Sequence, residues 1–126
     1  MDVLRTALGA ACLVYGVVFA VAALLHAGIA VVPLSQPVIV PAAIVETACA
    51  CALAVAGYGA LARRPWAWDG IVYAHAAALS GVLLGILAVA FGATDPDPLL
   101  DWYHRSVAVL LGIGLGGAFY VSRVRR

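Results

Sequence analysis

Residues 38–62 read VIVPAAIVETACACALAVAGYGALA, an apolar stretch that contains a single charged side chain, Glu46. A helix needs about 20 apolar residues to cross the hydrocarbon of a bilayer, so this stretch is long enough. Glu46 is also the only glutamate in the chain. A carboxylate in hydrocarbon is costly unless it is protonated or paired, so Glu46 marks the strongest candidate for a polar site.

Three further stretches have the same character, at residues 4–29, 67–91 and 99–121. The chain of 126 residues is 66% apolar and only 10% charged. A soluble domain of this size carries about 25% charged residues. We therefore expect an all-α integral membrane protein that forms one domain over residues 1–126, with four transmembrane helices.

The breaks between the stretches carry residues that end or start helices. Prolines interrupt residues 33–41, and Arg-Arg-Pro at residues 63–65 follows the second stretch. Within Asp-Pro-Asp-Pro at residues 95–98, Asp97 is the predicted N-cap and Pro98 the first helical residue. The connections are short, so consecutive helices are predicted to be antiparallel neighbours in a four-helix bundle.

The arginines predict the orientation. Six of them fall on one side of a four-span topology: Arg5, Arg63, Arg64, Arg123, Arg125 and Arg126. The other side has only Arg105, so the positive-inside rule places both termini in the cytoplasm. The chain has no lysine and is rich in Ala, Gly, Val and Arg, which fits a high-GC bacterial genome. We expect a multi-pass protein of the prokaryotic inner membrane.

Each stretch carries small residues at helical spacing, which let helices approach closely in lipid. The four predicted stripes are Gly9, Cys12, Gly16, Ala20, Ala23 and Ala27; Glu46, Cys49, Ala50, Gly57 and Ala60; Ala74, Ala78, Gly81, Gly85 and Ala88; and Arg105, Ala108, Gly112 and Gly116. A bundle this small encloses little interior, so the sequence favours a homodimer or docking onto a larger membrane complex. The net charge of +1 argues against a protein that binds nucleic acid.

Depth along the helices brings four polar residues to one level: Glu46, Arg105, His26 and His104. Two pairings stay open at this point. Arg105 can form a bidentate pair with Glu46, or it can pair with Asp101, four residues earlier on the same helix. In the second case Glu46 is protonated or bonded to a backbone carbonyl.

Two cofactor alternatives involve residue pairs. His26 and His104 are the minimum for a bis-histidine haem b site between helices. Cys49 and Cys51 suggest a soft metal such as copper, but residues two apart on a helix point to different faces and chelate poorly. We predict neither a cofactor nor a metal.

His75 lies near the depth of Cys12, a weak suggestion of a second metal site. The ordinary expectation for an interior histidine is a hydrogen bond to a neighbouring hydroxyl. For His75 that hydroxyl would come from Tyr15 or Ser80.

The sequence contains no nucleotide-binding, zinc-protease or nucleophile-elbow motif. We therefore expect a non-enzymatic accessory or assembly subunit, or a protein that binds a small apolar ligand near Glu46. A proton-coupled transporter that uses Glu46 is a second class. A redox protein that holds haem or quinone at His26 and His104 is a third.

Overall fold

The computed structural model describes residues 2–93 and 97–124, and this part of the chain is almost entirely helical. Its elements are α1 (Asp2–His26), α2 (Val40–Leu61), α3 (Ala67–Ala90), α4 (Pro98–Phe119) and a short π-helix, η1 (Tyr120–Val124). Within the described ranges, four helices are long and apolar enough to cross a membrane, as the sequence predicts. The all-helical class is therefore confirmed.

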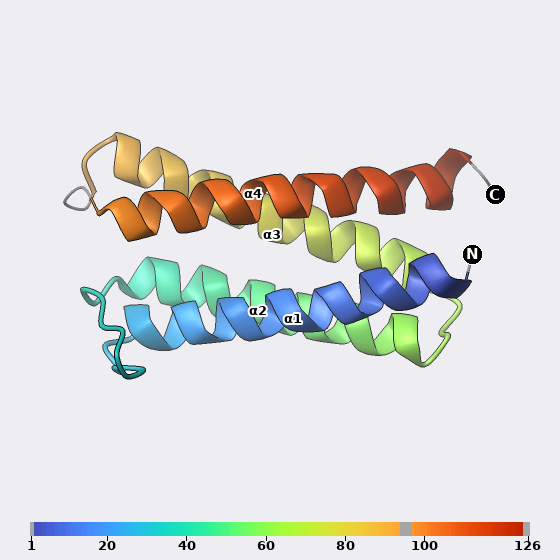
Figure 1. The fold of residues 1–126 in the computed structure, drawn as a ribbon, viewed down its shortest axis with the longest axis horizontal. Coiled ribbons are helices and arrows are strands. Elements are labelled where there is room, and N and C mark those ends of the chain that lie inside the picture. The colour runs from blue at the N-terminus through green and yellow to red at the C-terminus, as the bar shows by residue number, and fades with distance from the viewer. Residues whose placement is uncertain (1, 94–96, 125–126) are drawn as a thin grey trace.

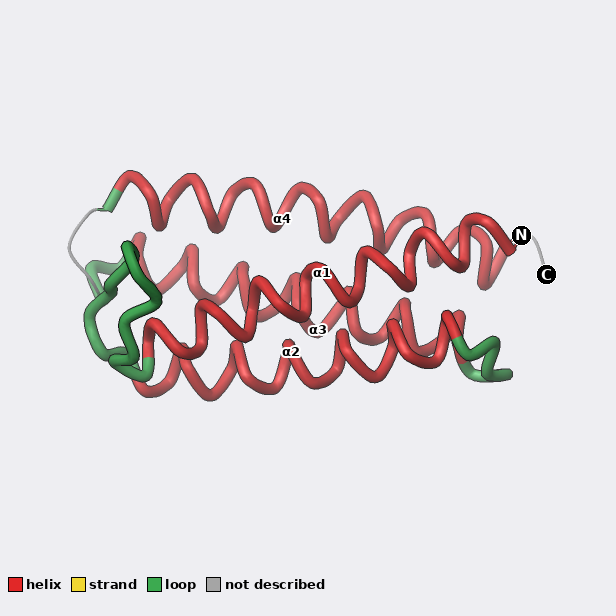
Figure 2. Tube along the Cα trace, turned by 60° about the horizontal axis from the view of Figure 1, so that its bottom comes forward, coloured by secondary structure: helices red, strands yellow, loops and turns green. Residues whose placement is uncertain are grey.

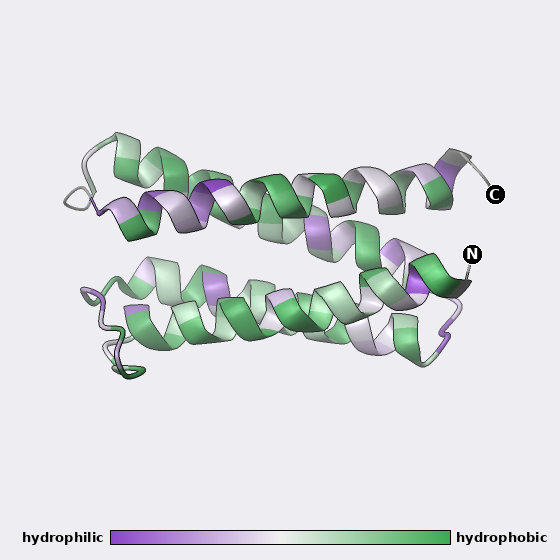
Figure 3. Ribbon diagram, in the orientation of Figure 1, coloured by the Kyte–Doolittle hydropathy of each residue, from purple (hydrophilic) through white to green (hydrophobic). Residues whose placement is uncertain are grey.

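Consecutive helices run in opposite directions, and both termini lie at the same end of the molecule (Figure 1). We call the opposite end, where α1 stops and α2 starts, the loop end (Figure 2). Hydrophobic residues follow the helices along their length, and a few hydrophilic bands interrupt α2, α3 and α4 (Figure 3). Each helix packs on the next, but within the described residues α4 packs closely only on α3 and η1.

The α1–α2 contact is built on glycine. A Cβ placed on Gly9 would lie 2.6 Å from the Cβ of Ala60, and one on Gly57 would lie 2.7 Å from Leu13. No side chain larger than hydrogen fits at either position without a shift of the two helices. The small residues predicted to bring these two helices together are therefore confirmed at Gly9, Gly57 and Ala60.

α1 ends at His26, three residues before the predicted boundary. Gly28 takes a φ of 86°, in the left-handed region that favours glycine. The Ile29 N–H then donates to the Leu24 carbonyl at 2.9 Å, and the Gly28 N–H donates to Leu25 at 3.0 Å. This helix stop leaves His26 in the last turn of α1.

α4 begins as the sequence predicts, with Asp97 as N-cap and Pro98 as the first helical residue. The Leu99 N–H donates to Oδ1 of Asp97 at 2.9 Å, and Gln36 Nε2 donates to Oδ2 at 3.2 Å. These hydrogen bonds, from Gln36 first and Leu99 second, lower the pKa of the Asp97 carboxyl. The Gln36–Asp97 bond ties the α1–α2 connection to the start of α4.

The predicted inward face of the fourth helix is wrong. Nothing lies within 4 Å of a Cβ placed on Gly112 or Gly116, and Arg105 is exposed. The buried residues of α4 are instead Leu100, His104, Val107, Leu111 and Ala118. Adjacent residues on a helix are about 100° apart, so the true face is the predicted one turned by one position.

Two histidine–glycine contacts account for this rotation of α4. A Cβ on Gly85 of α3 would lie 2.5 Å from Nε2 of His104, and one on Gly114 of α4 would lie 2.5 Å from Nε2 of His75. In each contact, a histidine ring of one helix packs against a glycine of the other. These contacts, and not the Gly112–Gly116 spacing, determine how α3 and α4 meet.

Candidate functional site

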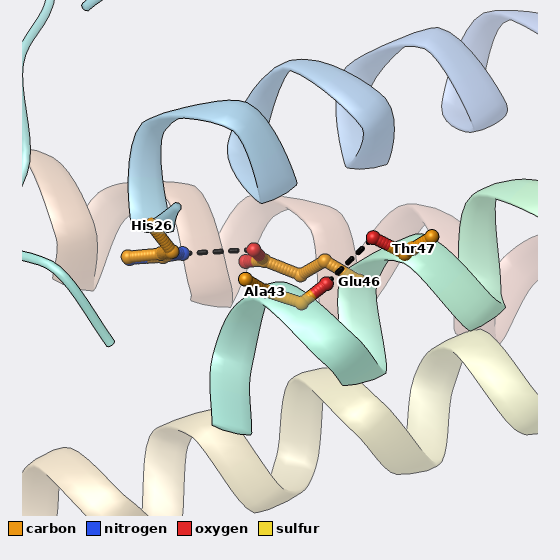
Figure 4. Close-up of polar contacts among 4 residues, drawn as sticks. All are labelled: His26, Ala43, Glu46 and Thr47. Atoms are coloured by element: carbon orange, nitrogen blue, oxygen red, sulfur yellow. Dashed lines mark hydrogen bonds and ion pairs between the residues drawn. The ribbon is translucent and has the colours of Figure 1, made fainter. Parts of the chain in front are cut away.

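The buried carboxylate of Glu46 faces the imidazole of His26 across the α1–α2 contact (Figure 4). Nδ1 of His26 lies 2.8 Å from Oε2 of Glu46, and both residues are buried. In Figure 4 the neighbouring Thr47 hydroxyl donates to the Ala43 carbonyl at 2.7 Å, a bond within α2. The partner of Glu46 is therefore a histidine of the preceding helix.

The loop end positions this pair. The helix stop at Gly28 leaves His26 in the last turn of α1, and its carbonyl accepts from the Ile39 N–H at 2.9 Å. That bond holds the start of α2 against the end of α1. Glu46 follows in the second turn of α2, so its side chain can reach the imidazole.

The four predicted site residues separate into two groups. Glu46, His26 and His104 are buried and border one cavity. Arg105 instead pairs with Asp101 on its own helix, with Nε 2.8 Å from Oδ1 and side chains that are 74% and 54% exposed. Of the two pairings that the sequence left open, the structure has the one with Asp101.

The cavity has a volume of about 380 Å³ and lies among all four helices near the loop end. That volume is at the lower end of the range for small-molecule sites, about 300–1,000 Å³. Its walls are mostly apolar, with Phe19, Ile39, Val45, Val82 and Leu100 among them. An apolar chamber with a few converging polar groups is typical of a binding site for a small lipophilic molecule.

Tyr103 is a site residue that the sequence reasoning missed. It also borders the cavity, and its buried hydroxyl has no hydrogen-bond partner among the described residues. Its ring lies 5.3 Å from that of His104, centroid to centroid. The sequence places Tyr103 where an interfacial aromatic is expected, so only its burial distinguishes it from a membrane-surface tyrosine.

A second hollow opens between α1 and α4, the two helices that do not pack closely on each other. It measures about 300 Å³ and is lined by Val17, Val21, Leu99 and Trp102, among others. We call it the α1–α4 groove. His26, Leu100 and Tyr103 border both the groove and the cavity, so the two hollows share a wall.

His75 occupies a closed environment farther along the molecule. Its Nδ1 donates to the Ile71 carbonyl of the same helix at 2.9 Å, so the expected bond to a hydroxyl of Tyr15 or Ser80 is not formed. Tyr15 instead meets the ring edge-on at 6.0 Å between centroids. Cys12 Sγ lies 3.8 Å from Nδ1, which is a weak contact.

Cofactor ligands are sparse in the described residues. No three of their His, Cys, Asp or Glu side chains are grouped closely enough to hold a metal ion. Cys49 is buried and Cys51 is exposed, as expected for residues on different faces. A bis-histidine haem would need His104 Nε2 to face an iron, and this atom lies against Gly85.

Comparisons of the chain with protein-family models, with curated proteins and with solved structures give no match. The chemistry of the cavity is therefore the basis for assigning a function.

Proposed function

We propose that the chain is a small membrane protein that binds a lipophilic molecule of the bilayer in the cavity beside His26 and Glu46. The observation that carries this proposal is a buried, hydrogen-bonded ionisable pair in the wall of an otherwise apolar chamber of about 380 Å³. Intramembrane ionisable groups are expensive and in general mark functional sites. Packing alone would be met more cheaply by two apolar side chains.

The proposed setting is the cell membrane of a prokaryote, with both termini in the cytoplasm. Support comes from the four apolar helices and from the arginines at the end that carries the termini. The unpacked face of α4 at Gly112 and Gly116 is compatible with a second copy of the chain or with a larger membrane complex. An accessory role in such a complex is one way in which ligand binding would be used.

A titration of the purified protein in detergent tests ligand binding. The probe is 2-undecanone, and the readout is saturable heat in calorimetry. We expect Ala42→Phe to abolish binding, since Ala42 borders the cavity and a phenyl ring there fills it. Ala48→Phe is the matched control, because Ala48 is exposed on the same helix and borders neither hollow. Equal binding by both variants would place the probe outside the cavity.

A proton-coupled transporter is the second candidate, and the His26–Glu46 hydrogen bond favours it. A carboxyl and an imidazole in contact can exchange a proton as a substrate enters or leaves. Proteoliposomes loaded with a pH-sensitive dye would report substrate-dependent proton movement. Such movement should disappear with Glu46→Gln, whereas a binding protein moves no protons in either form.

A further inference from the structure

Two residues that border the cavity each have a buried polar atom without a hydrogen-bond partner within the described part of the chain. The two atoms are Nε2 of His26 and the hydroxyl oxygen of Tyr103. His26 as a whole is only 5% exposed. A buried polar atom without a partner is costly, so natural proteins rarely retain one without a reason. Two residues with such atoms in the lining of one apolar chamber point to a ligand.

The bond between His26 and Glu46 indicates what Nε2 can offer. A net charge in hydrocarbon is far more costly than a neutral pair, so we take the carboxyl and the imidazole together as a neutral pair that shares one proton between Oε2 and Nδ1. In that arrangement the other ring hydrogen is on Nε2, whichever of the two atoms holds the shared proton. Nε2 of His26 is then a donor.

The Tyr103 hydroxyl can also donate. With the Tyr103 hydroxyl donating, the cavity residues offer two donors, one from α1 and one from α4. We propose that the cavity takes a lipophilic molecule with a carbonyl head group, whose oxygen accepts hydrogen bonds from His26 and Tyr103. A carbonyl oxygen has two lone pairs and no hydrogen, which matches two donors. Ketones, quinones and esters share this head, and the inference rests on the proposed function.

The α1–α4 groove brings such a molecule from the side to the wall of the cavity. Val17 and Trp102 on its walls are 64% and 67% exposed, so the groove opens on the outer surface of the helices. Its inner wall includes His26 and Tyr103, the two donors. A molecule dissolved in the bilayer would meet the residues of both head-group contacts at the wall that the groove shares with the cavity.

Three probes of similar length and different heads test the inference on the wild-type protein in detergent. They are 2-undecanone, which only accepts; undecane, which does neither; and undecylammonium, which only donates. Two hydrogen bonds to the carbonyl predict that the ketone binds about tenfold or more tightly than the alkane. The ammonium ion should bind more weakly than the ketone, since a donating Nε2 of His26 offers it no acceptor.

The outcomes separate the inference from the proposed function. If undecane binds as tightly as the ketone, the cavity is a purely apolar site and the carbonyl inference is wrong. Tighter binding of undecylammonium would also overturn the inference, because it would indicate that the ammonium ion pairs with an ionised Glu46. If none of the three binds saturably, the proposed ligand-binding function itself fails.

An infrared measurement gives a readout independent of affinity. The carbonyl stretch of bound 2-undecanone should move to lower frequency, as it does for any hydrogen-bonded ketone. Tyr103→Phe should reverse part of this shift and weaken ketone binding about fivefold, with undecane binding unchanged. Tyr73→Phe is the control, since Tyr73 is exposed on α3 and borders neither hollow. An unchanged carbonyl band in the Tyr103 variant would contradict the assignment.

Discussion

His26 and His75 are both buried, both use Nδ1 in a hydrogen bond, and both leave Nε2 without a partner among the described residues. They differ in what lies beside Nε2. His75 meets Gly114 so closely that a Cβ there would be 2.5 Å away, whereas His26 borders the cavity and the α1–α4 groove. An unpartnered atom indicates a ligand site only where there is space for a ligand.

The partners of Nδ1 differ as well. His75 donates to a carbonyl of its own helix, four residues earlier, so that bond does not depend on the position of another helix. His26 meets Glu46 of α2, so this bond depends on two helices at once. We therefore assign His75 to packing between helices and His26 to the ligand site.

The largest expected effect on stability is at His75, the histidine whose Nε2 lies against a glycine. Gly114→Ala would place a methyl group against the His75 ring, and overpacking of this kind costs about 1–3 kcal/mol. Gly112→Ala, two residues away on α4, meets nothing within 4 Å and should be neutral or slightly stabilising, because alanine favours helix over glycine. The free energy of unfolding in mixed micelles measures both. Equal stability of the two variants would mean that His75 is not closely packed.

The second prediction concerns the coupling of each histidine to its neighbour. A double-mutant cycle of His26→Leu and Glu46→Leu should give a coupling of about 1–2 kcal/mol in the free energy of unfolding. Either single change leaves a buried polar group without its partner, and the double change removes both.

The matched cycle uses Cys12→Ala and His75→Leu. Here we expect a coupling near zero, because the Sγ–Nδ1 distance of 3.8 Å is a weak contact and Nδ1 already donates to Ile71. A strong coupling in this second cycle would remove the distinction between the two histidines.

The sequence predicted the helices well, because apolar length and helix stops are local properties. Asp97 and Pro98 start α4 as expected, whereas α1 ends three residues before its predicted boundary, where Gly28 is left-handed. Depth along the helices also brought His26 and Glu46 to one level. These predictions need no knowledge of which helix faces which.

Rotation and packing were beyond the sequence. The small residues at Gly112 and Gly116 resemble a packing stripe, but the bulkier face with His104 and Leu111 is the buried one. The spatial fit of His104 to Gly85 and of His75 to Gly114 determines that choice. The cavity and the role of Tyr103 likewise depend on side chains from helices distant in sequence.

The third prediction is that acid destabilises the loop end near His26 and leaves the packing around His75 unchanged. The pKa of Asp97 is lowered by its bonds from Gln36 and Leu99, so the ionised form stabilises the folded state. This stabilisation is complete above the ordinary aspartate pKa of about 4 and is lost as the pH falls through the lower folded value. Hydrogen exchange should therefore show lost protection at residues 27–39 near His26, and none around His75.

Asp97→Asn should remove this acid sensitivity, because an amide does not titrate, while the side-chain oxygen can still cap α4. Comparison of protection factors at the same pH corrects for the intrinsic rate of exchange. Loss of protection around His75 in the same pH range would show that acid acts on the whole molecule and not on the loop end alone.

The smallest effect is expected at Arg105, the predicted site residue that the structure places outside the cavity. Its pair with Asp101 is an exposed i,i+4 contact, worth about 0.3–0.5 kcal/mol. Arg105→Gln and Asp101→Asn remove the same interaction, so both should lower stability equally little and leave 2-undecanone binding unchanged. If Arg105 instead reached Glu46, only the arginine variant would weaken binding, and Asp101→Asn would free the arginine to strengthen it. The two alternatives therefore give opposite patterns in one pair of variants, measured by the same calorimetric titration with 2-undecanone.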